Sequence, residues 1–172
     1  AGPAGVMVPA VSSADEARAA VKACRYPPEG IRGVAHSVIR ASGYGVDIGG
    51  YLEWFKTEFL LICQIETMEG VDAVDAIASV EGVDMLLVGP MDLSASAGHF
   101  NNPDCATIDA LMARVSEAAK NAGALLGTMA TAGRTAPALF EAGYHFVLDT
   151  VDITLLREMA QAKVAASRSY TK

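Results

Sequence analysis

The sequence alternates short, continuously apolar runs with longer amphipathic segments along its whole length of 172 residues. Uninterrupted apolar runs bounded by turn residues are typical of strands buried on both faces, as in parallel sheets covered by helices. The pattern therefore predicts an α/β fold built from strand–helix units. A five-stranded doubly wound sheet and part of an eight-stranded barrel both fit this pattern. The predicted strands are residues 5–11, 59–66, 84–89, 125–129 and 145–149.

The amphipathic segments predict a helix after each strand and one further helix within the first connection. Ser12 or Ser13 is a candidate N-cap of the first helix. Asp15 and Glu16 would lie in its first turn, where the helix dipole favours acids. Residues 25–33 carry paired prolines and two glycines, so they cannot continue that helix. The predicted helices are residues 14–24, 51–56, 68–79, 105–122, 134–142 and 153–167.

The composition is that of a folded globular protein, with 52% apolar and 19% charged residues, and we expect a single domain over residues 1–172. The net charge of −7 argues against binding to nucleic acids or anionic membrane surfaces, which attract basic proteins. No run approaches the roughly 18 apolar residues of a membrane span, and no signal peptide is recognisable. We therefore expect a protein of the cytoplasm or an organelle matrix, without nucleic-acid or membrane partners.

The three cysteines, Cys24, Cys63 and Cys105, are odd in number and form no C-x-x-C pair. A structural zinc site is built from such pairs, so none is expected here. We predict free, unreactive thiols in a reducing compartment.

Two acids each follow a predicted buried strand: Glu66 after the second strand and Asp92 after the third. The carboxyl ends of parallel strands meet at one edge of the sheet, where functional groups gather. Two carboxylates there suit a hard cation such as Mg²⁺ or Mn²⁺. Spacing alone leaves open the alternative that both acids cap the turns or helices that follow them. The Gly-Pro turn at 89–90 also leaves the backbone N–H groups of Met91 and Asp92 as candidate anion donors.

Several motifs in chain order resemble the HpcH/HpaI family of class II pyruvate aldolases, which includes 4-hydroxy-2-oxo-heptanedioate aldolase. The likeness covers essentially the whole chain. It is carried most distinctively by R-Y-P-P-E-G-I-R-G at 25–33, Q-I-E-T at 64–67 and G-P-M-D-L-S at 89–94, with further matches at 8–11, 14–17, 40–42, 81–84 and 152–156.

The resemblance implies a partial (β/α)₈ TIM barrel of the phosphoenolpyruvate/pyruvate type. This chain would supply about strands 4 to 8, and the N-terminal strands would be absent from it. Glu66 and Asp92 would hold the divalent metal, Mg²⁺ or Mn²⁺, with Co²⁺ as a further candidate. Gln64 and the backbone N–H groups of Met91 and Asp92 would bind the 2-oxo acid substrate.

The activity implied is that of a carbon–carbon lyase. It would cleave 4-hydroxy-2-oxo acids to pyruvate and an aldehyde through a metal-stabilised enolate, without a lysine Schiff base. The family's acid/base histidine and its substrate-orienting arginine would lie before Ala1, so no catalytic residue is assigned in this chain. Two alternatives stay open: a non-catalytic structural or interaction subunit of a larger assembly, and a citrate-lyase-β-like acyl-CoA lyase, for which no added CoA-binding stretch is visible.

None of the three histidines, His36, His99 and His145, occupies a position where the family has its base. Arg32 and Arg40 lie within matching motifs, and we expect both to brace the loop that contains them rather than to bind substrate.

The resemblance also implies a homo-oligomer, a trimer or a hexamer, in which the closing helix at 153–167 packs on a neighbouring copy. Leu155, Leu156, Met159 and Val164 recur there at near-helical spacing. The alternative is that this apolar stripe covers the chain's own barrel. Because five strand–helix units leave a barrel open, a complementing N-terminal segment is a second expected partner.

Overall fold

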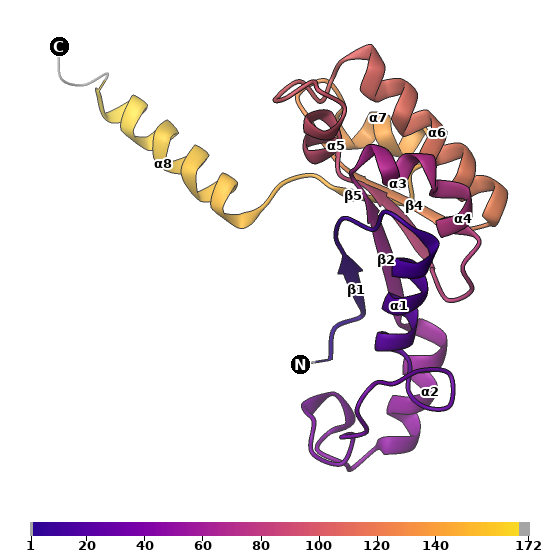
Figure 1. Cartoon of the computed structure of the whole chain (residues 1–172). Coiled ribbons are helices and arrows are strands. Elements are labelled where there is room, and N and C mark those ends of the chain that lie inside the picture. Colours follow the sequence, from indigo (N-terminus) through magenta and orange to yellow (C-terminus); the bar gives the residue numbers. More distant parts are fainter. Residues whose placement is uncertain (1, 169–172) are drawn as a thin grey trace.

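Five parallel strands lie side by side in the order in which they occur in the sequence, β1-β2-β3-β4-β5 (Figure 1). The computed structural model describes residues 2–168. A doubly wound sheet would reverse its strand order at a switch point. The strictly sequential order is instead that of a barrel wall, and the sheet is a half-barrel. The strands are β1 (Gly5–Val8), β2 (Leu60–Ile65), β3 (Met85–Val88), β4 (Leu125–Met129) and β5 (Phe146–Leu148).

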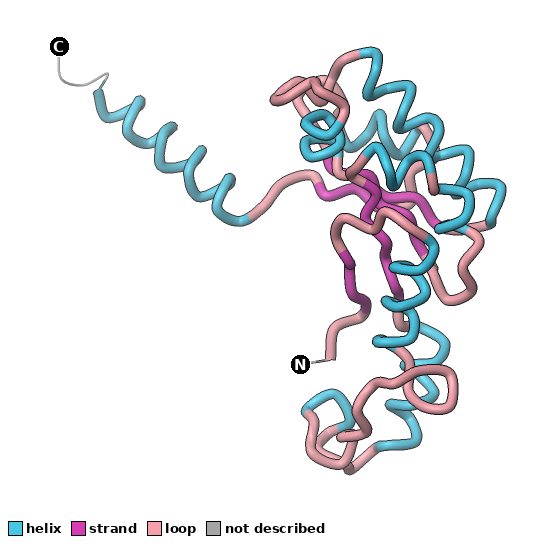
Figure 2. Tube along the Cα trace, viewed as in Figure 1, coloured by secondary structure: helices cyan, strands magenta, loops and turns pink. Residues whose placement is uncertain are grey.

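The helices that connect the strands cover one face of the sheet, as Figures 1 and 2 show. Helical crossover connections are usual between parallel strands. A 3₁₀ turn, Arg40–Ser42, lies in the long connection between α1 and α2. The helices are α1 (Ala14–Cys24), α2 (Ile48–Glu58), α3 (Met68–Asp72), α4 (Val74–Ala78), α5 (Pro90–Ser96), α6 (Ala106–Ala122), α7 (Ala136–Glu141) and α8 (Asp152–Arg168).

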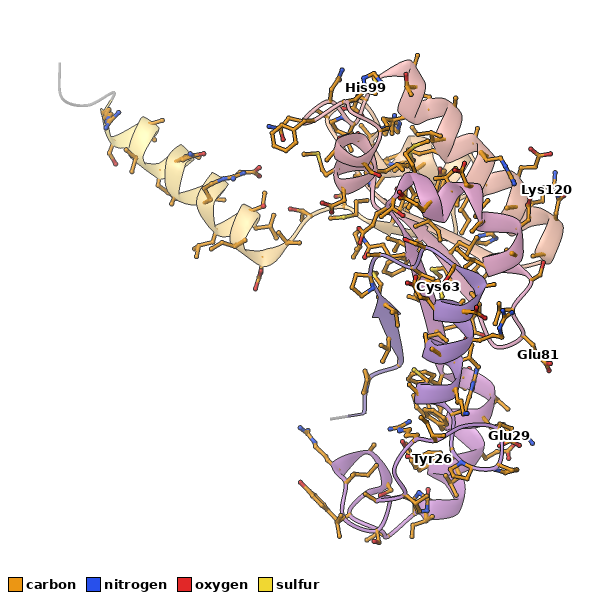
Figure 3. The ribbon with its side chains drawn as sticks, in the orientation of Figure 1. Tyr26, Glu29, Cys63, Glu81, His99 and Lys120 are labelled. Carbon is orange, nitrogen blue, oxygen red and sulfur yellow. The ribbon has the colours of Figure 1, made fainter. Side chains whose placement is uncertain are left out.

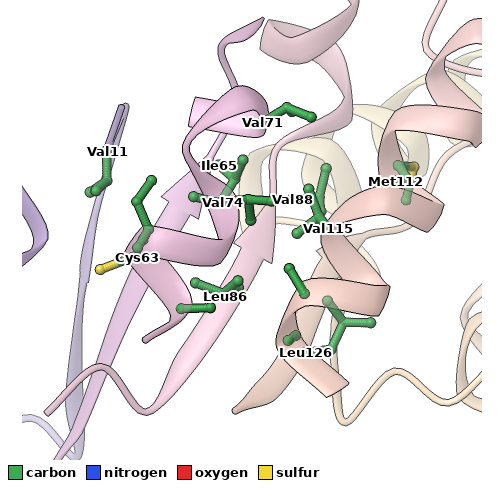
Figure 4. Close-up of a cluster of buried hydrophobic side chains, with 14 of the residues drawn as sticks. Val11, Cys63, Ile65, Val71, Val74, Leu86, Val88, Met112, Val115 and Leu126 are labelled. Atoms are coloured by element: carbon green, nitrogen blue, oxygen red, sulfur yellow. The ribbon is translucent and has the colours of Figure 1, made fainter. Parts of the chain in front are cut away.

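The main core lies between the sheet and helices α1, α3, α4, α5, α6 and α7 (Figure 4). Alternate residues of β2 and β3 point into it, because successive side chains of a strand face opposite sides. A second, smaller cluster around Ile62, Met85 and Leu87 lies on the other face. The main core includes Cys63, Ile65, Val74, Ile77, Leu86, Val88, Ile108, Val115 and Leu126.

Leu86 is fully buried in this core, whereas Leu155 on α8 is 56% exposed. Replacing Leu86 by Ala is expected to lower the free energy of unfolding by about 3 kcal/mol, since the cavity left behind adds to the lost burial. The same substitution at Leu155 should change it by less than about 0.5 kcal/mol in the single chain. Urea unfolding followed by circular dichroism measures both variants, and equal losses would contradict this assignment of the core.

The sequence-based elements are confirmed in number and order for the strands, and α1 has the predicted bounds. Three details were wrong. The predicted helix 68–79 is broken at Ala73 into α3 and α4. Helix α5 was not predicted, because a Gly-Pro pair was interpreted as a turn, although proline is well accommodated in a first helical turn. Strand β1 is shorter than predicted and only partly buried.

Helix α8 projects away from the rest of the chain in Figure 1, and it contains no buried residue. The alternative that its apolar stripe covers the chain's own sheet is therefore wrong. Leu156 is 66% exposed and Met159 is 59% exposed. Within residues 2–168, no helix combines the length and hydropathy that a bilayer crossing requires.

Arg32 braces the loop after α1, as expected. Its guanidinium carbon lies 4.6 Å from the ring centre of Tyr26 and 4.5 Å from that of Phe55. It also donates a hydrogen bond to the Tyr51 hydroxyl at 3.2 Å. Cation–π stacking and this hydrogen bond fix the arginine in a structural position. Figure 3 shows Tyr26 at the end of the molecule far from the loop that contains His99.

Candidate metal centre

Glu66 and Asp92 lie at the same edge of the sheet. Glu66 directly follows β2, and Asp92 lies in the first turn of α5, which follows β3. Strands β2 and β3 are neighbours, with Ile65 paired to Val88. The two carboxyl groups are close enough for Asp92 to raise the pKa of Glu66. The structure thus brings together the two acids that the sequence singled out.

Neither acid caps a helix. Thr67, not Glu66, is the N-cap of α3, and its Oγ1 accepts a hydrogen bond from the N–H of Gly70 at 3.0 Å. The N-cap of α5 is Gly89, without a side-chain cap. The capping alternative for these acids is therefore wrong.

The Glu66 side chain is 8% exposed and is held at both oxygens. Oε1 accepts a hydrogen bond from the backbone N–H of Ala10 at 2.9 Å. Oε2 accepts one from Nε2 of Gln64 at 2.6 Å. A carboxylate has about four lone-pair sites, so both oxygens keep capacity for a further partner. The two hydrogen bonds orient the carboxylate and leave lone pairs on both oxygens.

Burial is the largest cause of the raised pKa of Glu66. The nearby Asp92 carboxyl raises this pKa further, while the hydrogen bond from Ala10 opposes the shift. Two carboxylates that converge in a partly desolvated place repel each other when both are ionised. A cation between them would remove that repulsion.

The raised pKa predicts a pH dependence of stability in metal-free solution. As the pH rises above the ordinary value of 4.5, the unfolded chain releases the Glu66 proton before the folded chain does. The folded state then binds more protons, so its stability falls through the interval up to the folded-state pKa. Relative to Glu66→Gln, the wild type should therefore lose stability over this interval. Urea unfolding at a series of pH values with EDTA measures the difference, and parallel pH profiles would contradict the prediction.

The Gly89 backbone packs closely against the Glu66 carboxylate. A Cβ at this position would lie 2.6 Å from Glu66 Oε2 and 2.7 Å from Gln64 Nε2, closer than atoms can approach. Only glycine therefore allows the backbone to approach the ends of the Glu66 and Gln64 side chains this closely. The two convergent carboxylates, with lone pairs left on the Glu66 oxygens, fit the oxygen-donor set of Mg²⁺ or Mn²⁺.

The first turn of α5 carries the two candidate backbone donors, the N–H groups of Met91 and Asp92. Gly89 and Pro90 precede them as N-cap and first helical residue. N–H groups in the first turn of a helix have no partner within the helix. They lie in the same turn as the Asp92 carboxylate. The Met91 side chain is 47% exposed.

The histidines do not join this centre. Nδ1 of His145 accepts a hydrogen bond from the N–H of Leu126 at 3.1 Å, next to the amino ends of β4 and β5. His36 lies edge-on to the Tyr26 ring, with ring centres 5.4 Å apart. His99 lies in the loop after α5 (Figure 3). In the described part of the chain, no group of three or more His, Cys, Asp or Glu side chains is placed to hold a metal ion.

The cysteines also stand apart from the centre. Cys24, Cys63 and Cys105 are free thiols, as predicted. Cys63 is fully buried in the main core, and burial is the chief reason that its pKa is raised to about 11. A thiol with such a pKa is a poor nucleophile at neutral pH.

Ala10 is a site residue that sequence reasoning missed. It contributes only a backbone N–H, and 56 residues separate it from Glu66 in the sequence. No side-chain motif signals such a contact.

The half-barrel of five sequential parallel strands defines an α/β protein of the TIM-barrel-like class. The chain belongs to the HpcH/HpaI aldolase/citrate lyase family, whose model matches residues 1–158.

Among curated relatives, a hydroxypyruvate/pyruvate aldolase of Chromohalobacter salexigens is 37% identical over 160 residues, and the match covers 93% of this chain and 63% of the relative. A 4-hydroxy-2-oxo-heptane-1,7-dioate aldolase of Shigella sonnei is 39% identical over 160 residues, covering 93% and 61%. The chain therefore spans less than two thirds of the length of these relatives.

Solved structures show the same fold. A HpcH/HpaI aldolase/citrate lyase family protein from Burkholderia cenocepacia J2315 superposes with a TM-score of 0.86 at 35% identity, covering 97% of this chain and 66% of that one. A HpcH/HpaI aldolase from Desulfitobacterium hafniense DCB-2 gives a TM-score of 0.85 at 28% identity, covering 97% and 64%.

Proposed function

We propose that this chain forms the metal-binding part of a metal-dependent aldolase that cleaves 4-hydroxy-2-oxo acids to pyruvate and an aldehyde. The observation that carries the proposal is the convergence of Glu66 and Asp92 at one sheet edge, where neither serves as a helix cap. The substrate class follows the names of the relatives, which act on hydroxypyruvate, pyruvate or a 4-hydroxy-2-oxo diacid.

Glu66 and Asp92 would hold one divalent cation, Mg²⁺ or Mn²⁺, with Co²⁺ as a third candidate. When bound, such a cation supplies Lewis-acid polarisation of a keto oxygen. Ala10 and Gln64 hold the Glu66 carboxylate in one orientation. Gln64 would contact the 2-oxo acid substrate at this edge of the sheet.

The carboxylate end of a 2-oxo acid would bind to the backbone N–H groups of Met91 and Asp92. Backbone donors at the start of a helix bind anions without a charged side chain. No lysine is needed in this arrangement. The proton-transferring groups would come from outside the described chain, since no histidine joins the site.

The single domain over residues 1–172 would be about strands 4 to 8 of a phosphoenolpyruvate/pyruvate-type barrel. Strands β1 and β5 are the two ends of the sheet and have unpaired outer edges. Such edges are normally covered in a stable protein. An N-terminal segment that adds strands to these edges would complete the barrel.

A second copy of the chain is the proposed partner of α8. This helix buries none of its own residues and exposes Ile153, Leu155 and Leu156. Exposed apolar stripes of this kind mark interfaces. A trimer or a hexamer would bury it.

The proposed activity is tested by pyruvate release from a 4-hydroxy-2-oxo acid in a preparation whose barrel has been completed with the missing strands. Pyruvate should form with Mn²⁺, fall to background with EDTA, and recover when Mn²⁺ is restored. The alternative of a non-catalytic subunit predicts no pyruvate under any of these conditions and no Mn²⁺ binding. Activity that is indifferent to EDTA would contradict the metal-dependent proposal.

A further inference from the structure

The loop after β1 is joined to the loop after β2 by a pair of hydroxyl groups. Oγ of Ser12 and Oγ1 of Thr67 lie 2.8 Å apart, although 55 residues separate them in the sequence. Val11 strengthens the contact between these loops, because its N–H donates to the carbonyl of Gln64 at 3.1 Å. The hydroxyl pair thus lies beside the residues that position Glu66.

The direction of the hydrogen bonds through this pair follows from the number of protons. Oγ of Ser12 donates to the carbonyl of Ala10 at 3.2 Å. A hydroxyl has a single proton to donate, so Thr67 must donate to Ser12. Thr67 in turn accepts from the N–H of Gly70, which anchors it to the first turn of α3. The chain of bonds therefore runs from α3 through Thr67 and Ser12 to the Ala10 peptide.

Ala10 has an unusual backbone conformation. Its φ of 53° lies in the left-handed region, which residues other than glycine rarely adopt. In this conformation its N–H donates to Oε1 of Glu66 at 2.9 Å. A disfavoured conformation persists where neighbouring contacts determine it. The contact from Ser12 to the Ala10 carbonyl is such a determinant.

We propose that Ser12 and Thr67 are positioning residues: they hold Ala10 in its left-handed conformation so that its N–H fixes the Glu66 carboxylate for metal binding. The inference rests on the proposed metal site. It concerns residues that contact neither the cation nor the substrate. It also gives a role to the hydrogen bond between Ser12 and Thr67, which is not one of the capping hydrogen bonds of α1 or α3.

The test compares Ser12→Ala with Ser13→Ala in the full chain. Both variants remove a serine hydroxyl from the same loop, but Ser13 Oγ accepts a hydrogen bond from the backbone N–H of Glu16 in α1, whereas it is Ser12 Oγ that donates to the Ala10 carbonyl. A merely structural role of the loop would make the two variants alike. Thr67→Ser keeps the hydroxyl and is the conservative variant.

Hydrogen exchange of the Ala10 amide, measured by NMR in EDTA, reports the positioning without any metal. Ser12→Ala should speed this exchange at least about tenfold by freeing the Ala10 peptide. Ser13→Ala and Thr67→Ser should leave it at the wild-type rate. An unchanged rate in Ser12→Ala would overturn the inference, whether or not the chain binds metal.

Mn²⁺ affinity, measured by the EPR signal of the free ion, reports the consequence for the site. Ser12→Ala should weaken binding about tenfold, the lower end of the range for residues that orient metal ligands. Ser13→Ala and Thr67→Ser should bind as the wild type does. If Glu66→Gln loses Mn²⁺ while Ser12→Ala binds normally, the positioning role is wrong and the metal site stands. If the wild type binds no Mn²⁺, the proposed function fails, and amide exchange alone decides whether the hydroxyl pair holds Ala10.

Discussion

Replacing Glu66 by Gln is expected to weaken Mn²⁺ binding by more than about 100-fold, beyond the loss seen when only an outer partner of a metal ligand is removed. The substitution keeps the shape of the side chain and its burial, but it removes the charge that a hard cation requires. Asp92→Asn should have an effect of the same order, because the proposed site contains only these two protein carboxylates.

Glu69→Gln is the matched control for this experiment. Glu69 lies three residues after Glu66, in the first turn of α3, and it is exposed. The substitution makes the same change of net charge three residues away without touching the proposed site. Isothermal titration with Mn²⁺ measures all three variants. Equal affinities for Glu66→Gln and Glu69→Gln would show that binding is a general effect of negative charge rather than a property of this site.

Replacing Gly89 by Ala is expected to weaken Mn²⁺ binding about tenfold while costing only about 1–3 kcal/mol of stability. The added Cβ would meet the ends of the Glu66 and Gln64 side chains at 2.6 Å and 2.7 Å. Both ends belong to flexible side chains and can move, so the fold survives. The carboxylate would then leave the orientation in which Ala10 and Gln64 hold it.

Gly49→Ala is the control for Gly89→Ala. Gly49 lies in α2, and a Cβ added there would meet nothing within 4 Å. Alanine in a helix is favoured over glycine by about 1 kcal/mol, so this variant should be slightly more stable and bind Mn²⁺ normally. Thermal unfolding and Mn²⁺ titration of the two variants separate a site effect from a backbone effect. Normal Mn²⁺ binding by Gly89→Ala would show that the close approach of Gly89 to Glu66 is not needed for the site.

Local signals predicted most of the helices and strands. Helix α1 has the predicted bounds because Ser13 provides a cap and Arg25 begins a proline-rich loop. Ala73 breaks the next predicted helix, although no glycine or proline marks the break. Strand β1 lies at an edge of the sheet, and periodicity does not reveal which strand has only one neighbour.

The sequence predicted the site residues that lie at the ends of consecutive strands. It did not predict those that reach the site through contacts between distant segments. Glu66 and Asp92 stand at the ends of adjacent apolar runs, so parallel pairing alone brings them to one edge. Ala10 and Ser12 bond to Glu66 and Thr67 from 56 and 55 residues away, respectively, and no local pattern carries that information. That neither acid caps a helix also required the structure, because the residue at which each following helix begins could not be read from the sequence.

The sequential strand order determines which strand is the last to detach from the sheet during local unfolding. Strand β3 is the middle strand, with a partner on both sides, and all four of its residues are buried. Edge strands fray at a lower free energy than central ones. The proposed metal ligands follow the central strand and its neighbour β2, so spontaneous fluctuations that detach β5 leave their relative geometry undisturbed.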